Sequence, residues 1–247
     1  SVWVNHHVIN IGYVHDRLGQ QPYHDALIVL TWLASQTSRV QLGTSVLVMP
    51  YLHPMVLAKE LATLDHLCGG RLVVGLGVGS LPEENDVLGS DYDARGAYSN
   101  EFIQVMLRLW TQERASFEGE HFSFSDVVTS PKPLQQPHPP IVIGGNRAPA
   151  LRRVARLGDG WHPLGVSPDG VAERLITIRA EAAAVGRVGI PSVVQVRRDI
   201  DGIEPELVAA YAAAGVDELV VSCSTGNVEE IRSIIDRFAE THIGNHQ

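Results

Sequence analysis

The sequence predicts an α/β protein with the (β/α)8 architecture of a TIM barrel. Short apolar, β-branched runs alternate with longer runs at helical spacing, a pattern typical of parallel strands joined by right-handed crossovers. The run Leu72–Gly79 is apolar or glycine almost throughout, as expected of a strand buried on both faces. The chain has 247 residues, which suits one barrel domain. We therefore predict a single barrel over residues 1–247, with an open doubly wound sheet as the alternative.

Seven segments have the composition of strands. They are Val2–Val4, Val40–Met49, Leu72–Gly79, Ile141–Ile143, Gly160–Leu164, Ser192–Val196 and Glu218–Cys223. Because the first of them begins without any lead-in, and a barrel of this class has eight strands, we expect the first barrel strand to precede Ser1.

Helical spacing of apolar residues separates these strands. The predicted helices are Ala26–Ser35, Pro54–Leu67, Ala97–Thr111, Pro149–Leu157, Ala172–Val185, Leu207–Ala214 and Val228–Thr241. Between the third and fourth, Phe117–Phe124 alternates around Gly119 like a small hairpin, and Ser130–Pro140 holds five prolines in eleven residues. We interpret residues 112–140 as a small insertion into the barrel.

Composition and charge restrict the classes of function. Hydrophobic residues make up 45% of the chain and charged residues 19%, which is typical of a globular core. The formal net charge of −9 argues against a broad nucleic-acid surface. No apolar run approaches the roughly 18 residues of a membrane span, and the first residues do not form a secretory signal. Cys68 and Cys223 are isolated, as in a cytoplasmic protein. A small-molecule ligand is the partner we expect.

Functional residues of a parallel barrel gather where its strands end, and the first strand ends in Asn5-His6-His7. An imidazole titrates near neutral pH and can exchange a proton with a substrate. Neighbours in an extended segment point apart, so we expect only one of the two histidines to face the pocket. Two loop histidines without a role are the alternative. A zinc site is not expected, because no third ligand has suitable spacing.

The second and third strand ends are rich in glycine and hydroxyl groups. Gly43-Thr44-Ser45-Val46 would let a planar ring lie against the backbone, although a simple strand bulge accounts for it equally well. The run Gly75–Ser80 has the form G-x-G-x-G and fails the dinucleotide fingerprint. We expect its glycines to clear space for a ligand. The carboxylates that follow are interpreted as a solvated loop rather than a glycosidase pair; they are Glu83, Glu84, Asp86, Asp91 and Asp93.

The fourth strand end, Gly144-Gly145-Asn146, carries the strongest local signal. Glycines expose backbone N–H groups, and the helix that follows adds partial positive charge at its N-terminus, so the sequence predicts a phosphate site here. The alternative is a tight turn before a solvated helix. Four arginines lie at the start of this helix or within it, of which the last three are expected to be partly solvent-facing: Arg147, Arg152, Arg153 and Arg156.

These residues together resemble the luciferase-like flavin monooxygenases, and within them the coenzyme F420-dependent oxidoreductases of actinobacteria. The resemblance runs over nearly the whole chain and rests on the order of short motifs rather than on any one of them. The motifs are Thr37–Val46, His53-Pro54, Ala58–Asp65, Gly69–Arg71, Gly75–Gly79, Glu84, Gly89, Arg95-Gly96, Leu109–Thr111, Phe117–Gly119, Pro131–Pro133, Ile143–Gly145 and Arg156–Trp161.

The resemblance implies a dimeric barrel that binds coenzyme F420, or FMN as the alternative. It implies a non-prolyl cis peptide at Ser45-Val46 behind the ring, a phosphate at residues 144–146, and Gly79 and Ser80 at the ring edge. His7 stands at the position of a histidine that donates or accepts a proton in some relatives, and His6 stands where relatives carry Asp. Ser80 stands where many relatives carry Trp. The implied cofactor-binding residues are Thr44, Ser45, Val46, Gly79, Ser80, Gly144, Gly145, Asn146 and Trp161.

The leading functional hypothesis is hydride transfer between the deazaflavin and a small organic substrate. Three alternatives stay open: an FMN-dependent monooxygenase that consumes oxygen, a non-catalytic cofactor-binding protein, and a barrel enzyme acting on a sugar phosphate. The replacement of Asp by His6 keeps the non-catalytic alternative open. The loops Gly12–Tyr23 and Leu81–Tyr98 are expected to build the substrate pocket.

Overall fold

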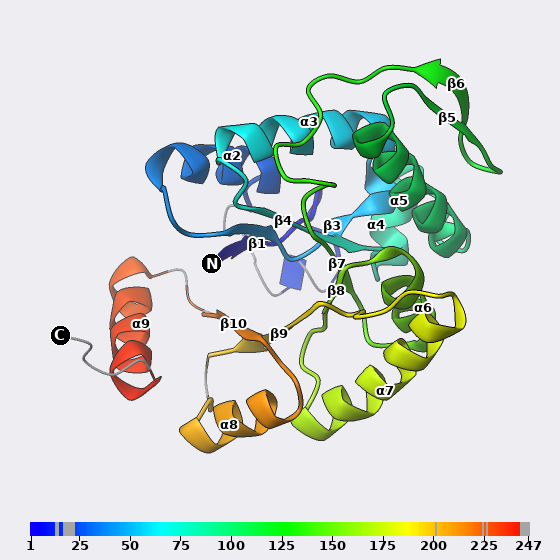
Figure 1. Ribbon diagram of the computed structural model, residues 1–247. Coiled ribbons are helices and arrows are strands. Elements are labelled where there is room, and N and C mark those ends of the chain that lie inside the picture. The colour runs from blue at the N-terminus through cyan, green and yellow to red at the C-terminus, as the bar shows by residue number, and fades with distance from the viewer. Residues whose placement is uncertain (13–14, 17–22, 201, 224, 226, 243–247) are drawn as a thin grey trace.

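The strands of the computed structural model form a parallel sheet that curves into a nearly closed barrel (Figure 1). The structure describes residues 1–12, 15–16, 23–200, 202–223, 225 and 227–242. Each strand pairs in parallel with the next in a single order around the wall. That order is β1 (Val2–Val4), β2 (Leu42–Thr44), β4 (Leu72–Gly77), β7 (Ile141–Gly144), β8 (Gly160–His162), β9 (Val193–Asp199) and β10 (Glu218–Ser222).

The predicted barrel class is confirmed, and each of the seven predicted strands overlaps a strand of the wall. The eighth strand expected before Ser1 stays a prediction. Within the described residues, β1 and β10 are the two ends of the strand order, and the side chain of Ser1 donates a hydrogen bond to Glu218 across them. Most of the loop 12–23, one of the two expected to build the substrate pocket, lies outside the described residues.

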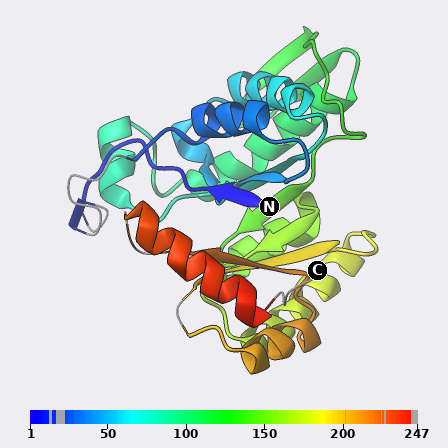
Figure 2. The ribbon, with the colours of Figure 1, turned by 90° about the vertical axis from the view of Figure 1, so that its left-hand side faces the viewer.

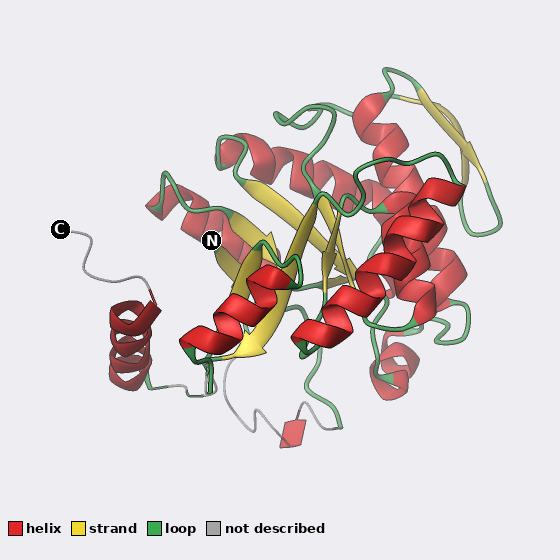
Figure 3. Cartoon of the chain, turned by 60° about the horizontal axis from the view of Figure 1, so that its bottom comes forward, coloured by secondary structure: helices red, strands yellow, loops and turns green. Residues whose placement is uncertain are grey.

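Helices cover the outside of the sheet (Figure 2 and Figure 3). Several carry a proline in the first turn, where its missing N–H group is not needed for an intrahelical hydrogen bond. The helices that follow the predicted periodicity are α2 (Ala26–Gln36), α3 (Pro54–Leu67), α5 (Arg95–Thr111), α6 (Ala148–Leu157), α7 (Pro168–Ala184), α8 (Pro205–Ala213) and α9 (Val228–His242). No helix within the described ranges has the length and apolar character needed to cross a membrane.

Two local predictions are corrected. The predicted strand Val40–Met49 is divided into β2 and β3 (Leu47–Val48), and a short 3-10 helix, Met49–Tyr51, follows. The segment predicted as a solvated loop forms α4 (Pro82–Leu88) instead. Its signals are a proline in the first turn, two acidic residues there that favour the positive end of the helix dipole, and Gly89 at φ 72° closing the C-terminus.

A hairpin stands apart from the barrel wall, at the upper right of Figure 1. Its strands β5 (Ala115–Glu118) and β6 (Ser123–Val127) pair antiparallel, in the segment predicted as a hairpin. The Glu101 carboxylate of α5 accepts hydrogen bonds from the amides of Glu120, His121 and Phe122 at 2.8, 2.9 and 3.2 Å. These bonds hold the pKa of Glu101 below its usual value, in spite of an opposing desolvation effect.

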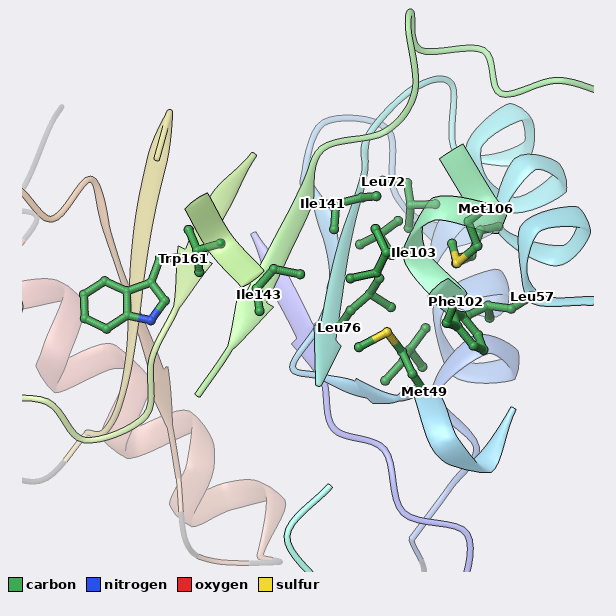
Figure 4. Close-up of a cluster of buried hydrophobic side chains, with 14 of the residues drawn as sticks. Met49, Leu57, Leu72, Leu76, Phe102, Ile103, Met106, Ile141, Ile143 and Trp161 are labelled. Atoms are coloured by element: carbon green, nitrogen blue, oxygen red, sulfur yellow. The ribbon is translucent and has the colours of Figure 1, made fainter. Parts of the chain in front are cut away.

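The core lies between the sheet and the helices. Figure 4 shows Leu72, Leu76 and Ile141 of the strands facing Phe102 and Met106 of α5, and all five side chains are fully buried. Burying each such side chain stabilises the fold by about 1.5–3 kcal/mol relative to exposure.

The prediction that Arg153 is partly solvent-facing is wrong. Its side chain is 6% exposed and ties α6 to α5, donating to Asn100 Oδ1 at 2.8 Å and to the carbonyl oxygen of Gly96 at 3.0 Å. Burial lowers the pKa of Arg153 to about 10. Arg152 and Arg156 are exposed, as predicted.

Candidate functional site

A cavity of about 780 Å³ lies at the carboxyl ends of the barrel strands. Each strand in the order β1 to β10 contributes lining residues, within it or directly after it. The volume is in the range of about 300–1,000 Å³ that small-molecule and cofactor sites occupy. The predicted site residues that line it are His7, Ser45, Val46, Gly79, Ser80, Gly144, Gly145 and Asn146.

The wall of the cavity between β2 and β3 is a bulge formed by Ser45 and Val46. Their peptide bond is cis, which confirms the expectation drawn from the resemblance. The Val46 side chain lies against glycines of two neighbouring strands: a Cβ added to Gly77 would come 2.4 Å from Val46 Cγ2, and one on Gly144 would come 3.2 Å from Cγ1. A Cβ on Gly75 would come 1.8 Å from the carbonyl oxygen of Thr44. The glycines do clear space, but residues 44 and 46 of this chain occupy it.

Ser45 is held by three other strands. Its amide donates to the carbonyl oxygen of Val4 on β1 at 2.8 Å, and its hydroxyl lies 2.8 Å from Nε2 of His162 on β8. Arg197 on β9 donates to the carbonyl oxygen of Ser45 at 3.4 Å and to Asn5 Oδ1 at 2.7 Å. Hydrogen bonds to the amide, the hydroxyl and the carbonyl of Ser45 therefore hold the bulge in place.

His162 is a cavity-lining residue that lies almost wholly inside the wall. It is 4% exposed, and its ring stacks on that of Trp3 with centroids 4.7 Å apart and an interplanar angle of 22°. Trp3 in turn requires glycine at position 43, where an added Cβ would come 2.3 Å from the indole. Burial, together with the positive charge of Arg197, lowers the pKa of His162 to about 4. The ring is neutral near pH 7.

His7 forms a pair with Glu84 of α4. His7 Nδ1 lies 3.0 Å from Glu84 Oε2, and the Glu84 carboxylate is fully buried. The other carboxylate oxygen accepts hydrogen bonds from the amides of Val8 and Ile9 at 3.0 and 3.4 Å, and the Tyr51 hydroxyl donates to Oε2 at 3.2 Å. This arrangement can orient an imidazole and accept its proton.

His6 overturns the expectation that only one histidine faces the pocket, since both line the cavity. His6 is 7% exposed, and its Nδ1 accepts a hydrogen bond from the amide of Val48 at 3.1 Å. Burial lowers its pKa, against the opposing effect of Asp25 and Glu84. His6 thus serves as a neutral anchor for β3.

The residues of the predicted phosphate site lie together at the end of β7, directly before α6. Gly145 has φ 104°, and a Cβ there would come 2.9 Å from Ala150 Cβ, so only glycine fits. Asn146 Nδ2 donates to the carbonyl oxygen of Leu164 at 2.9 Å, and α6 begins two residues later, at Ala148. Backbone N–H groups at a helix start suit an anion.

Two predicted cofactor residues lie behind the wall rather than in it. Trp161 is fully buried, and its indole donates to the carbonyl oxygen of Gly145 at 2.9 Å. Thr44 is also fully buried; its Oγ1 accepts from the amide of Gly75 and donates to the carbonyl oxygen of the same residue, both at 2.8 Å. Both residues support the backbone that lines the cavity.

The sequence analysis missed three residues of this site: Glu84, His162 and Arg197. Glu84 was assigned to a solvated loop, although Pro82 and the acidic first turn indicate a helix. His162 directly follows a motif residue, Trp161, inside the predicted strand Gly160–Leu164. Arg197 follows an apolar strand core, where an arginine marks a strand end. For Arg197, which directly follows the predicted strand Ser192–Val196, the rule that polar residues at strand ends are functional would have found the residue.

Comparisons of this chain with known proteins agree on one family. A family model described as luciferase-like monooxygenase matches residues 1–242. The FMNH2-dependent dimethylsulfone monooxygenase of Pseudomonas putida is 32% identical over 208 residues, which cover 82% of this chain and 57% of that protein. The F420-dependent glucose-6-phosphate dehydrogenase of Kineococcus radiotolerans is 37% identical over 166 residues, 65% of this chain and 47% of that protein. The chain thus spans about half the length of these two relatives.

The fold is also found among solved structures. An F420-dependent secondary alcohol dehydrogenase in complex with an F420-acetone adduct superimposes with a TM-score of 0.83. The match covers 100% of this chain and 90% of that one at 17% identity, and so shows a common fold.

We predict that His162 makes the protein less stable in acid. Its pKa is lowered from 6.5 to about 4, so the unfolded chain binds a proton first, and the free energy of unfolding falls as the pH drops from 6.5 towards 4. Between pH 7 and pH 5 this loss is about 2 kcal/mol. Urea unfolding at the two pH values, for the wild type and for His162→Gln, measures it.

His6 acts in the same direction and remains in the variant, so His162→Gln should reduce the acid sensitivity without removing it. An equal loss of stability in both proteins would contradict the assignment of His162 as a buried neutral ring.

Proposed function

Because this chain belongs to the luciferase-like monooxygenase family, we propose that it is an F420-dependent oxidoreductase that exchanges a hydride between the deazaflavin and a small organic substrate. The observation that carries the proposal is the convergence of three parts on one cavity: the Ser45-Val46 bulge, the glycines at 144 and 145, and the His7–Glu84 pair. A cytoplasmic location belongs to the proposal, in keeping with a chain that has only two cysteines.

The residues present fit a cofactor with a planar ring and a phosphate. The bulge offers a surface fixed by hydrogen bonds, and the Gly144–Asn146 segment before α6 offers N–H groups for an anion. A bound deazaflavin supplies the hydride donor and acceptor, while a flavin can in addition react with oxygen. Ser45, Val46, Gly144, Gly145 and Asn146 would hold either cofactor.

The side chains of the protein hold the bound molecules in position and exchange a proton with the substrate. His7 reaches the cavity from the end of β1, and Glu84 sets the orientation of its ring through the Nδ1 contact. Nε2 is then the nitrogen that can exchange a proton with the substrate. Glu84 is held in turn by two backbone amides and Tyr51, so the pair is fixed before any ligand arrives.

An FMN-dependent monooxygenase is the second candidate. It is favoured by the relative named as an FMNH2-dependent dimethylsulfone monooxygenase, whose match covers more of this chain than that of the F420-dependent relative. The deazaflavin assignment is supported by the higher identity to the F420-dependent protein.

We predict that the purified protein binds F420 at least tenfold more tightly than FMN. Cofactor fluorescence during titration measures both dissociation constants, and an oxygen electrode measures oxygen uptake with reduced FMN. We expect F420 reduction with a substrate drawn from a panel of alcohols and aldehydes, and no oxygen uptake. Tight FMN binding without F420 binding would overturn the cofactor assignment. Binding of F420 without turnover across a broad panel would favour a non-catalytic cofactor-binding protein.

We predict that His7→Ala lowers turnover of the substrate found in that panel by about 10²–10⁴-fold, the usual contribution of general acid–base catalysis. Glu84→Gln should lower turnover too, because the amide cannot accept a proton and can disturb the His7 contact. Glu83→Gln is the matched control, since Glu83 is the exposed neighbour on α4. The dissociation constant for F420 should change little in all three. Unchanged turnover in His7→Ala would remove this residue from the mechanism.

We also propose that the protein is a homodimer whose interface is the outer face of α2 and α3. An apolar groove lies between these helices, and the side chains of Ile28, Trp32 and Leu67 are 72%, 63% and 60% exposed there. A large exposed apolar patch marks an interaction surface, and a twofold axis lets one patch cover its own copy.

Trp32→Glu should therefore yield a monomer in light scattering coupled to size-exclusion chromatography, where the wild type yields a dimer. Val188→Glu is the control, because Val188 is 95% exposed and follows α7, on the other side of the barrel (Figure 1). A wild-type protein that elutes as a monomer at micromolar concentration would contradict this interface.

A further inference from the structure

Ser45 and His162 form a hydrogen-bonded pair within the cavity wall. Ser45 Oγ lies 2.8 Å from His162 Nε2. The two residues are 8% and 4% exposed, respectively, and both line the cavity. A hydroxyl can donate or accept, and so can an imidazole nitrogen, depending on which ring nitrogen carries the proton. The direction of this bond therefore decides what the Ser45 hydroxyl offers to a ligand.

The other nitrogen of the His162 ring sets that direction. Nδ1 is buried and has no hydrogen-bond partner among the described residues. A proton on Nδ1 would bury an N–H group without an acceptor, whereas a proton on Nε2 leaves Nδ1 with only an unused lone pair. Buried donors without an acceptor are rarer in proteins than buried acceptors without a donor, so the proton on Nε2 is favoured. Nε2–H therefore donates to Ser45 Oγ, and the neutral state of the ring agrees with a single proton.

The remaining polar atoms of Ser45 are already engaged. Its amide donates to Val4, and its carbonyl accepts from Arg197. The hydroxyl accepts from His162 and so keeps its own hydrogen, for which the described residues supply no acceptor. Since Ser45 lines the cavity, that hydrogen is available to whatever the cavity binds.

We propose that His162 holds the Ser45 hydroxyl as a hydrogen-bond donor for an acceptor atom of the molecule bound in the cavity. The inference rests on the proposed function, because a flavin or deazaflavin ring carries carbonyl oxygens and nitrogen acceptors at its edge. His162 is a positioning residue in this account, and Ser45 is the residue that contacts the ligand. A ligand that presents a donor at this point is disfavoured.

Three variants separate the bond direction from simple packing. Ser45→Ala removes the donor, and His162→Met removes the group that orients it while keeping an apolar side chain of similar length. His162→Gln keeps an N–H near the place of Nε2 and should restore the bond. His66→Met is the control, since His66 lies in the last turn of α3, at the other end of the barrel, and contacts the carbonyl oxygen of Lys132.

Titration with F420 and with FMN should show about tenfold weaker binding of the preferred cofactor for Ser45→Ala and for His162→Met, the effect of one hydrogen bond. His162→Gln and His66→Met should stay within about threefold of the wild type. The absorption maximum of the bound ring should shift in the two weakened variants and not in the two others. Histidine ¹⁵N NMR should show His162, identified by its absence in His162→Gln, as the Nε2–H tautomer with and without cofactor.

An Nδ1–H tautomer would overturn the inference, because Ser45 would then donate to His162 and offer the ligand an acceptor. Tight wild-type binding that neither Ser45→Ala nor His162→Met weakens would also overturn it while leaving the proposed function intact. A wild-type protein that binds neither cofactor would contradict the proposed function, and the tautomer measurement would still decide the bond direction.

Discussion

The contact between Val46 and the glycines of two neighbouring strands is the constraint on which the site depends. Gly77 on β4 and Gly144 on β7 leave the volume that the Val46 side chain fills, and a methyl group at either position would collide with it or crowd it. Ser45 and Val46 both line the cavity. Ser45 can then reach β1, β8 and β9 at once.

The polar groups around this bulge form two separate systems. One joins Ser45, His162 and Arg197 and fixes the shape of the wall. The other joins His7, Glu84 and Tyr51 and holds a protonatable ring at the cavity. Burial of a carboxylate is costly unless donors surround it, and Glu84 meets that condition through backbone amides and the Tyr51 hydroxyl. The two systems meet in one cavity, and both involve the end of β1, through Val4 in the first system and His7 in the second.

Much of the barrel could be predicted from the sequence, because periodicity and the glycine and proline signals at element ends are local. Residues 144–146 could be located for the same reason, since glycines before a helix have a direct physical meaning. Glu84 could not be recognised from its charge alone, because its role depends on amides 75 and 76 residues away in the chain. His162 gains its character from Trp3 and Arg197, which only the closed sheet brings to it. Gly75 and Gly77 were identified as space-making residues, but their occupants, Thr44 and Val46, belong to another strand.

Two imidazoles, those of His6 and His162, are built into the wall of the cavity as buried, hydrogen-bonded rings. His6 uses Nδ1 as an acceptor for the backbone of β3, and burial lowers the pKa of both His6 and His162. Burial therefore favours the neutral form of both rings, and the His162 ring carries no charge near pH 7. A rate profile that bends near neutral pH would therefore report on a group other than His162, and the kinetics of this barrel can be interpreted without a correction for that part of the cavity wall.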